Sequence, residues 1–488
     1  FYRWIKRINI LLVYPSYIPT YRWFGKATSM VFPPLGLLYI AAVLEQKGHK
    51  VHLLDTNVEG LDSGNIGKRI RGMSPDLIGF SATTMMVKEA LREANAIKEI
   101  YPDVPIVMGG QHASVAPEQV LSNPSVDFVI RGEGELACIE LVKQSEKIGT
   151  KSDFSKILGL SYKKDGKIVH NPTATLVSNI DVLPYPAYHL LKNLNSYYSP
   201  RTRKKPMTTC ITSRGCAFCC VFCSVHTVMG KAVWRGHSPQ YVANLIEYLI
   251  ERFGVKDLSI QDDSFTEDMN RAEAICDEII HRKLYEKIGW RLPNGIRCDR
   301  VSKRLLVRMK RAGCYHISFG IESGNQRILD TNGKKLKIED IRNAVTWAHE
   351  VGIEVSGSFM IGLLGDNGYT IRKTIDFAKS LPLDFASFNI AIPHLGTVFY
   401  EIVKKRGKLL MEDPCEFRYY AGESGAIFEL GECTKELMVK MQKDAIWQFY
   451  FRPSYILRRI IRLRLYDIPF YLRGLRGVVD YLKDFGKC

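Results

Sequence analysis

Three cysteines with short spacing are the residues of this chain best suited to chemistry. Cys216, Cys220 and Cys223 form the pattern CxxxCxxC soon after a predicted strand that ends at Thr212. Three thiolates can occupy three irons of a cubane 4Fe-4S cluster and leave the fourth iron without a protein ligand. A zinc site would need tetrahedral closure by further ligands. The spacing therefore favours an iron–sulfur cluster with one open iron over a zinc knot or a redox switch.

A further cysteine, Cys219, lies inside the same run and offers a competing CxxC pair with Cys216. We predict that it is a spectator thiol, because it lies within the longer spacing. The chain has 12 cysteines in all, without the regular framework of a small disulfide scaffold. Their clustering favours metal binding over disulfides.

The cysteines follow the first of six predicted strands, which alternate with helical patterns. The strands cover residues 207–212, 257–260, 289–294, 316–320, 354–360 and 384–392. The helix between the first two begins at Ser238-Pro239, an N-cap followed by proline, and stops at Gly254. Alternation of this kind predicts a parallel sheet covered by helices. The cysteines would then lie at the carboxyl end of a strand, where barrels carry their chemistry.

This arrangement resembles the radical SAM superfamily, and the resemblance covers about residues 207–392. It implies a partial (β/α) barrel, S-adenosylmethionine chelated by the open iron, and reductive cleavage to a 5'-deoxyadenosyl radical that abstracts hydrogen from the substrate. It assigns cluster binding and catalysis to Cys216, Cys220 and Cys223. It also implies contacts to S-adenosylmethionine by residues of the loop and of later strand ends, namely Phe222, Asp262, Asp263, Arg297, Glu322 and Ile361.

Alternative roles remain open for several of these residues. Asp262 and Asp263 stand where the family often has a Gly-Gly-Glu segment, and two carboxylates there could also mark the entry of a helix. Arg297 and Glu322 follow the third and fourth strands. The alternative for them is a salt bridge with each other.

The first part of the chain shows a second alternating series. Strands are predicted over residues 8–14, 50–54, 77–81, 106–108 and 126–130, with helices over 35–46 and 86–100. The pattern predicts a Rossmann-like, doubly wound parallel sheet. Its loops resemble the cobalamin-binding domain that is fused to many radical SAM enzymes. The resemblance implies cobalamin contacts by residues that follow the strands, namely Ser81, Thr83, Thr84, Gly109, Gly110, His112 and Glu133.

The usual cobalamin motif DxHxxG is absent after the first strand, where the sequence reads Tyr14-Pro15-Ser16-Tyr17. The resemblance therefore implies cobalamin without a lower axial histidine from this loop. His112 is a candidate ligand, and the alternative is a loop histidine with ordinary hydrogen-bond partners.

Four regions are predicted. They are a cobalamin-binding domain (1–150), a connector (151–205) with a hairpin signal at Lys163-Lys164-Asp165-Gly166, a radical SAM barrel (206–400) and a basic helical region (401–488). Past about Tyr400 we expect no further strands. The fold class is thus α/β, with a Rossmann-like sheet, a partial barrel and a helical carboxyl-terminal region.

Composition limits the partners. The chain has 488 residues, 46% of them hydrophobic and 24% charged, with a formal net charge of +17. Such a charge requires an acidic partner: nucleic acid, anionic lipid or a phosphorylated substrate. No apolar run is long enough to span a bilayer, and no secretion signal is predicted, so we expect a cytoplasmic protein.

Apolar and arginine positions interleave at helical spacing over residues 446–465. This pattern fits a helix packed on the barrel with a solvated basic face, a helix on the inner membrane face, or a nucleic-acid contact. Nucleic acid is disfavoured, since no separate RNA-binding module follows the barrel.

The predicted function is anaerobic, cobalamin-dependent methylation of an unactivated carbon. The partners would be a small-molecule or lipid-like substrate and an external electron donor of flavodoxin or ferredoxin type. The alternative keeps the radical but transfers no methyl group, as in cyclisation, rearrangement or dehydration. A methylthiolation enzyme would need further cluster cysteines, and only Cys138 precedes Cys210. A non-enzymatic cobalamin sensor would leave the open iron unexplained.

Overall fold

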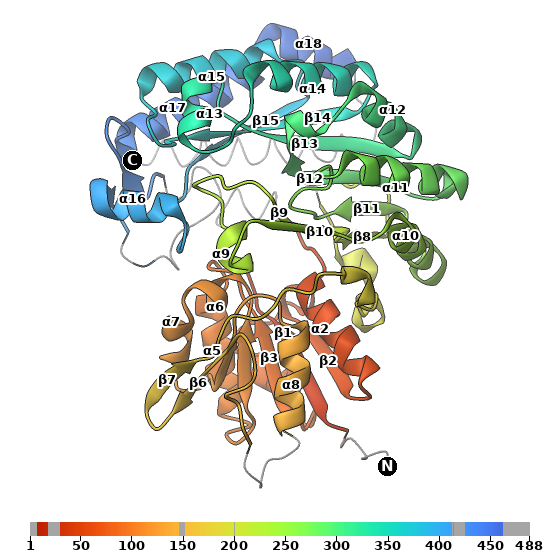
Figure 1. Ribbon diagram of the computed structural model, residues 1–488, viewed down its shortest axis with the longest axis vertical. Helices are drawn as coiled ribbons and strands as arrows, with labels where there is room; N and C mark the ends of the chain where they lie inside the picture. The colour runs from red at the N-terminus through yellow and green to blue at the C-terminus, as the bar shows by residue number, and fades with distance from the viewer. Residues whose placement is uncertain are drawn as a thin grey trace. The chain divides into compact units, whose positions relative to one another are not determined.

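The computed structural model describes residues 7–17, 30–145, 152–199, 201–411, 413 and 425–461. The chain divides into two compact units, each with its own sheet and core (Figure 1). Of the described residues, the first unit contains 7–17, 31–196 and 227–231, and the second contains residue 30, residues 197–226 and those from 232 onward.

The first unit is built on a seven-stranded sheet in the order β2-β1-β3-β4-β5-β6-β7. The first five strands in this order are parallel, and the last two are antiparallel. Their bounds are β1 Asn9–Tyr14, β2 Lys50–Asp55, β3 Leu77–Ser81, β4 Ile106–Gly109, β5 Phe128–Ile130, β6 Leu160–Lys164 and β7 Lys167–His170.

Helices cover this sheet because the strands are apolar on both faces. α2 packs against α8, and α4 packs against α5. Buried residues of β1, α2, α8 and the segment around Ile180 to Ala187 form one core cluster. The helix bounds are α2 Leu35–Gln46, α3 Thr56–Glu59, α4 Ile66–Ile70, α5 Val87–Lys98, α6 Gln111–Val115, α7 Pro117–Leu121 and α8 Glu135–Ser145, with short 3-10 helices at Ile180–Val182, Tyr188–Leu190 and Leu194–Ser196.

The hairpin signal at Lys163-Gly166 forms a hairpin, but its strands do not stand apart as a connector. β6 pairs antiparallel with β5, so the hairpin extends the first sheet. The apolar residues Leu160 and Tyr162 are buried in the core of this unit. Apolar side chains of the segment thus find their partners in the preceding domain, which local sequence does not specify.

The second unit is built on a six-stranded parallel sheet in the order β15-β14-β13-β12-β11-β8. Consecutive strands lie side by side, as in part of a (β/α) barrel. The predicted α/β fold class is confirmed. The strand bounds are β8 Met207–Cys210, β11 Asp257–Ile260, β12 Gly289–Ile296, β13 Cys314–Glu322, β14 Glu354–Ile361 and β15 Phe385–Ile390.

Helices follow the strands and cover one face of this sheet (Figure 1). The capping signals of α10 act as predicted: the Ser238 side chain accepts from the amide of Tyr241, and Gly254 is left-handed. The helix bounds are α10 Pro239–Phe253, α11 Met269–His281, α12 Lys303–Arg311, α13 Gln326–Thr331, α14 Ile338–Glu350 and α15 Gly368–Ser380, with 3-10 helices at Leu284–Glu286 and Cys298–Arg300.

The region after Tyr400 is mainly helical, but the expectation of no further strands is wrong. Two short strands, β16 (Lys408–Leu409) and β17 (Phe428–Glu429), pair antiparallel. Two-residue strands carry no periodic signal in sequence, so only the pairing reveals them. The helices are α16 Val398–Arg406, α17 Lys435–Tyr450 and α18 Pro453–Ile461. Arg462, Arg464 and the rest of the predicted basic tail lie outside the described residues.

Candidate functional site

The three cysteines lie in one loop that follows the first barrel strand. β9 (Ser213–Cys216) follows β8 and pairs antiparallel with β10 (Val233–Gly236), with Cys216 opposite Val233. Gly215 has φ +84°, and a Cβ there would lie 2.1 Å from the carbonyl oxygen of Val233. Only glycine fits this conformation and close approach. Gly215 therefore directs the chain into the cysteine loop.

The loop is tied to the turn that follows α13. The amide of Val221 donates to the carbonyl of Asn332 at 3.1 Å, and the Cys220 thiol lies 3.9 Å from the carbonyl of Gly333. Within the loop, the amide of Cys223 donates to the carbonyl of Cys220 at 3.1 Å. These contacts hold Cys220 and the residue after it against a second element of the barrel.

The three thiols share one electrostatic environment. Burial raises the pKa of Cys216, Cys220 and Cys223, the last to about 12. Negative charge on Cys220 raises the pKa of both other thiols, and charge on Cys216 raises the pKa of Cys223. At Cys220, the positive charges of Lys334 and Arg297 act in the opposite direction and lower the pKa of the thiol. Each thiol therefore lies within electrostatic reach of the other two.

This donor set fits a cubane cluster. In the described part of the chain, no three Cys, His, Asp or Glu side chains are grouped so that together they could bind a single metal ion. A cubane needs a different arrangement, because each of its irons takes one thiolate and the irons lie apart. Three neighbouring thiols, with Cys219 exposed beside them, match a 4Fe-4S cluster with one open iron.

Asp262 and Asp263 brace the strand that leads to the cysteines. Asp262 is 4% exposed and accepts from the amide of Thr212 at 2.6 Å and from the hydroxyls of Thr212 and Ser213 at 2.5 and 2.6 Å. Asp263 accepts from the amide of Gly215 at 3.0 Å. Helix α11 begins only at Met269 and has its own N-cap, so the pair does not mark a helix entry. A contact of either carboxylate to S-adenosylmethionine stays a prediction.

Arg297 lies against the cysteine loop. Its guanidinium stacks over the ring of Phe218, 3.5 Å from the ring centroid, and pairs with both carboxylate oxygens of Asp299 at 2.9 and 3.0 Å. It also donates to the carbonyls of Lys334 and Lys335. The salt bridge considered between Arg297 and Glu322 is not formed, because Asp299 takes the guanidinium.

Glu322 pairs instead with a lysine that the sequence reading missed. The ammonium of Lys334 lies 2.9 Å from the Glu322 carboxylate, and both side chains are about one-tenth exposed. Burial lowers the pKa of Lys334, but the charges of Glu322 and Cys220 outweigh it and raise the pKa. Lys334 follows the Asn332-Gly333 turn signal. An Asn-Gly pair is typical of a turn, but it does not show that this turn faces the cysteines.

Phe222 and Ile361 complete the predicted contacts to S-adenosylmethionine. Phe222 is half-buried and lies between Cys220 and Cys223 in the sequence. Ile361 is the last residue of β14 and lies opposite Ile390. Ile361 is 1% exposed, so its backbone is the part that a ligand could reach. Both roles stay predictions.

In the first unit, the predicted cobalamin residues gather at the carboxyl ends of β3 and β4. Ser81 lies opposite Gly109 in the parallel register, and Thr83 opens the turn before α5. Gly110 has φ +95°, and a Cβ there would lie 2.7 Å from the carbonyl oxygen of Ala82. Open parallel sheets bind ligands at this edge, so the glycines and hydroxyls fit a cobalamin tail.

His112 and Glu133 lie in the neighbouring loops. The two ring nitrogens of His112 lie 3.3 Å from the Thr84 hydroxyl and 3.2 Å from the Gln119 amide oxygen. His112 is fully buried, which matches the alternative of a histidine with ordinary partners. Glu133 is half-buried just before α8. Binding of cobalamin by either residue stays a prediction.

Two family models match the chain. Residues 25–142 match the B12 binding domain, and residues 210–378 match the radical SAM superfamily. The first range covers the strand ends with Ser81 and Gly110, and the second includes the three cysteines, Arg297, Glu322 and Lys334.

Relatives match over most of the chain. The uncharacterized methyltransferase PH0819 of Pyrococcus horikoshii is 34% identical over 475 residues, which are 97% of this chain and 99% of the relative. The anaerobic magnesium-protoporphyrin IX monomethyl ester cyclase of Rubrivivax gelatinosus is 27% identical, over 79% of this chain and 68% of the relative.

Among solved structures, the radical S-adenosylmethionine methyltransferase TsrM from Kitasatospora setae, with cobalamin and a [4Fe-4S] cluster bound, has the same fold. The TM-score is 0.72, with 18% identity and coverage of 92% of both chains.

Proposed function

This chain belongs to the B12-binding radical SAM family, and from that premise we propose that it transfers a methyl group to an unactivated carbon of a small molecule. It is a radical SAM enzyme whose cofactors are a 4Fe-4S cluster, S-adenosylmethionine and cobalamin. The observation that carries methyl transfer is the 34% identity, over nearly the whole of both chains, with a relative named as an uncharacterized methyltransferase.

The residues divide the work between the two units. Cys216, Cys220 and Cys223 would hold the cluster, which supplies the electron that cleaves S-adenosylmethionine. Glu322 and Arg297 would bind polar groups of that cofactor from neighbouring strand ends. Lys334 keeps Glu322 paired and oriented. The loops with Ser81 and Gly110 would hold cobalamin, which carries the methyl group. We propose a flavodoxin or ferredoxin as the electron donor.

A second function is supported by the cyclase of Rubrivivax gelatinosus, which matches over 79% of this chain. In that case the same radical would start a cyclisation, rearrangement or dehydration without methyl transfer. The cysteine loop and its cation neighbours serve both reactions equally, so the product must distinguish them.

Product mass tests the proposal. Anaerobically reconstituted protein would be incubated with reductant, a small-molecule cell extract and S-adenosylmethionine that carries a deuterated methyl group. We expect a product that has gained a CD3 group, together with 5'-deoxyadenosine, because methyl transfer moves the intact label. Protein with alanine at all three cluster cysteines is the control. Deoxyadenosine without a labelled product would contradict methyl transfer and favour the second function.

The carboxyl-terminal helices carry an exposed apolar surface, formed by Ile446, Trp447, Phe451, Ile456, Leu457, Ile460 and Ile461. Trp447 and Phe451 stack at 4.1 Å between ring centroids, and Ile461 is 75% exposed. One expectation from the sequence was a packed helix with a solvated basic face. In α18, however, Arg459 points inward and pairs with Asp384 at 3.2 Å, and the apolar side of the helix is exposed.

We propose that this surface contacts an anionic membrane. Apolar and aromatic side chains insert at the lipid boundary, while the +17 net charge attracts anionic headgroups. No helix among the described residues is long and apolar enough to cross a bilayer. The contact would therefore be peripheral.

Vesicle co-sedimentation tests the membrane contact. We expect the protein to sediment with phosphatidylglycerol vesicles but not with phosphatidylcholine vesicles. The variant Leu457→Asp/Ile460→Asp should lose most of the binding, because both side chains are more than 60% exposed on the apolar face of α18. Val182→Asp, which changes a side chain 67% exposed in the first unit, is the matched control. Absence of sedimentation with the phosphatidylglycerol vesicles would contradict the membrane contact.

A further inference from the structure

A row of polar side chains crosses the barrel sheet near the amino ends of its strands. In the parallel register, one residue from each of five neighbouring strands, β8, β11, β12, β13 and β14, lies beside the next. These residues are Thr209, Ser259, Arg291, His316 and Glu354. The residue before Arg291 on β12, Trp290, donates from its indole to the carbonyl of Ala312 at the end of α12 and so faces the helices. Successive strand residues point to opposite faces. The polar row therefore faces the inside of the barrel.

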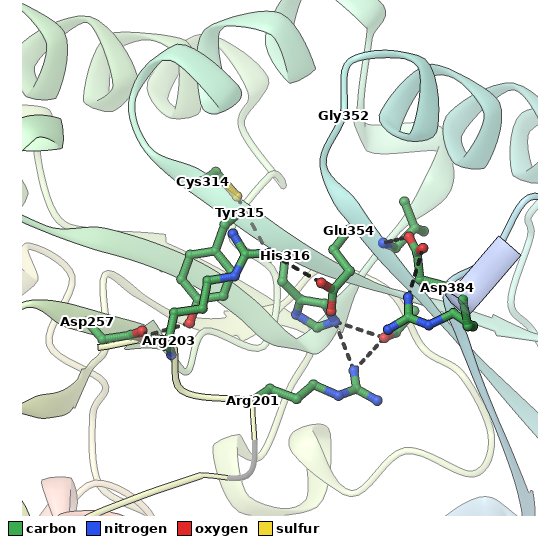
Figure 2. Close-up of polar contacts among 12 residues, drawn as sticks. Arg201, Arg203, Asp257, Cys314, Tyr315, His316, Gly352, Glu354 and Asp384 are labelled. Carbon is green, nitrogen blue, oxygen red and sulfur yellow. Dashed lines mark hydrogen bonds and ion pairs between the residues drawn. The ribbon is translucent and has the colours of Figure 1, made fainter. Parts of the chain in front are cut away.

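Two arginines from the segment before β8 reach this row (Figure 2). The guanidinium of Arg201 lies 3.0 Å from Nε2 of His316 and 2.6 Å from the Ser356 hydroxyl, and it stacks over the ring of Phe385 at 4.0 Å. Arg203 pairs with Glu354 at 3.2 Å. The segment thus adds two cations to the polar row, which already contains Arg291. We call this amino-terminal end of the barrel interior its floor.

The nearby carboxylates are hydrogen-bonded or paired with other groups, although the charge of Arg291 also acts on Asp257 and opposes the rise of its pKa by burial. Asp257 accepts from the Tyr315 hydroxyl at 2.8 Å and from the amides of Arg203 and Lys204 (Figure 2). Glu354 is held by Arg203. Among the described residues, neither Arg201 nor Arg291 has a carboxylate within ion-pair distance.

Arg291 is the least satisfied of these groups. Its side chain is buried, with 2% of the residue exposed, and Nε and Nη2 have no hydrogen-bond partner among the described residues. Nδ1 of the buried His316 likewise has none there. Burial lowers the pKa of His316 well below its usual value, and the charges of Arg201 and Arg291 add to that effect. The site therefore has excess positive charge and free donors.

We propose that Arg291, Arg201 and His316 form a buried binding site for an oxyanion, a carboxylate or a phosphate. Burying an unpaired guanidinium is costly, and a guanidinium fork matches two oxygens of one oxyanion. The neutral His316 ring can donate from Nδ1, since its Nε2 can accept from Arg201.

Two sources could supply the anion. One is free inorganic phosphate. The other is the acid group of the enzyme's substrate, and this second source rests on the proposed function. From His316 to Glu322 the strand β13 advances six residues, about 20 Å at ~3.3 Å per residue. An acid group bound at this floor would anchor the far end of an extended substrate, away from the reacting carbon.

Phosphate-dependent thermal unfolding of the reconstituted holoprotein tests the site. We expect a saturable rise in Tm of a few degrees as phosphate is added at constant ionic strength, because a ligand that binds only the folded state stabilises it. Arg291→Met should abolish this rise, and Arg291→Lys should weaken it. Arg304→Met, which removes an exposed arginine of α12 paired with Glu273, should keep it.

Mass spectrometry of small molecules released by denaturing the purified holoprotein identifies the source. Release of phosphate from the wild type but not from Arg291→Met supports a free anion, and release of an organic acid supports the substrate. An equal Tm rise in both proteins, or no rise and no released acid in the wild type, would overturn the proposal. Neither readout needs turnover, so a failed methyl-transfer assay would count against the proposed function alone.

Discussion

Alanine in place of Cys216, Cys220 or Cys223 is expected to abolish cleavage of S-adenosylmethionine. Each substitution removes one of three thiolates that lie in one loop within electrostatic reach of one another. Without the full set, the cluster is lost and the reaction falls back toward its uncatalysed barrier, a loss of about a thousandfold or more. The measurements are iron and sulfide content, expected to fall from about four of each per chain to near zero, and the 5'-deoxyadenosine formed under reducing conditions.

Cys219→Ala is the matched control, since it removes an exposed thiol from the same loop. It should keep both iron content and deoxyadenosine formation. Full iron content in the Cys220→Ala variant, or loss of iron in Cys219→Ala, would show that the ligands have been assigned to the wrong cysteines. Circular dichroism of each variant separates loss of the cluster from loss of the fold.

Lys334→Met is expected to destabilise the second unit by about 3–5 kcal/mol, because it leaves the buried carboxylate of Glu322 without its cation. Urea unfolding of the reconstituted protein measures this change. Glu322→Gln combined with Lys334→Met should be closer to the wild type, since a neutral amide costs less to bury than an unpaired carboxylate. The non-additivity of the two substitutions would measure the coupling within the pair.

Lys303→Met serves as the control for the loss of a lysine ion pair. Lys303 pairs with Glu350 at a similar distance of 2.8 Å, but both side chains are about half exposed. Its removal should change the unfolding free energy by less than about 1 kcal/mol. If Lys334→Met were no more destabilising than this control, the pair of Lys334 with Glu322 would not be a buried, stabilising ion pair.

Local signals predicted much of the fold. The strands over residues 77–81 and 257–260 have the predicted bounds, and the helix that Ser238-Pro239 and Gly254 bracket begins and ends where predicted. Caps, glycine stops and apolar runs act over a few neighbouring residues, so the sequence contains them directly. The hairpin at Lys163-Gly166 formed for the same reason, but its membership in the first sheet depended on distant apolar partners.

The candidate site was predictable where its residues are close in the chain. Cys216, Cys220 and Cys223 lie within eight residues, so their spacing alone indicates a shared metal centre. Lys334 was missed because its partner Glu322 belongs to another element and no local pattern links them. The three hydrogen bonds of Asp262 likewise reach residues about fifty positions earlier.

The order of the two α/β units, the cysteine loop and most strand positions can be read from the amino-acid sequence, because they depend on short-range periodicity and spacing. Which side chains meet depends on the folded chain: Lys334 lies against Glu322, Arg201 against His316, and Arg291 beside His316 on the neighbouring strand. Folding also turns Arg459 inward and leaves the apolar side of α18 exposed. Such pairings depend on strand register and on how distant segments pack, and a linear pattern does not encode either.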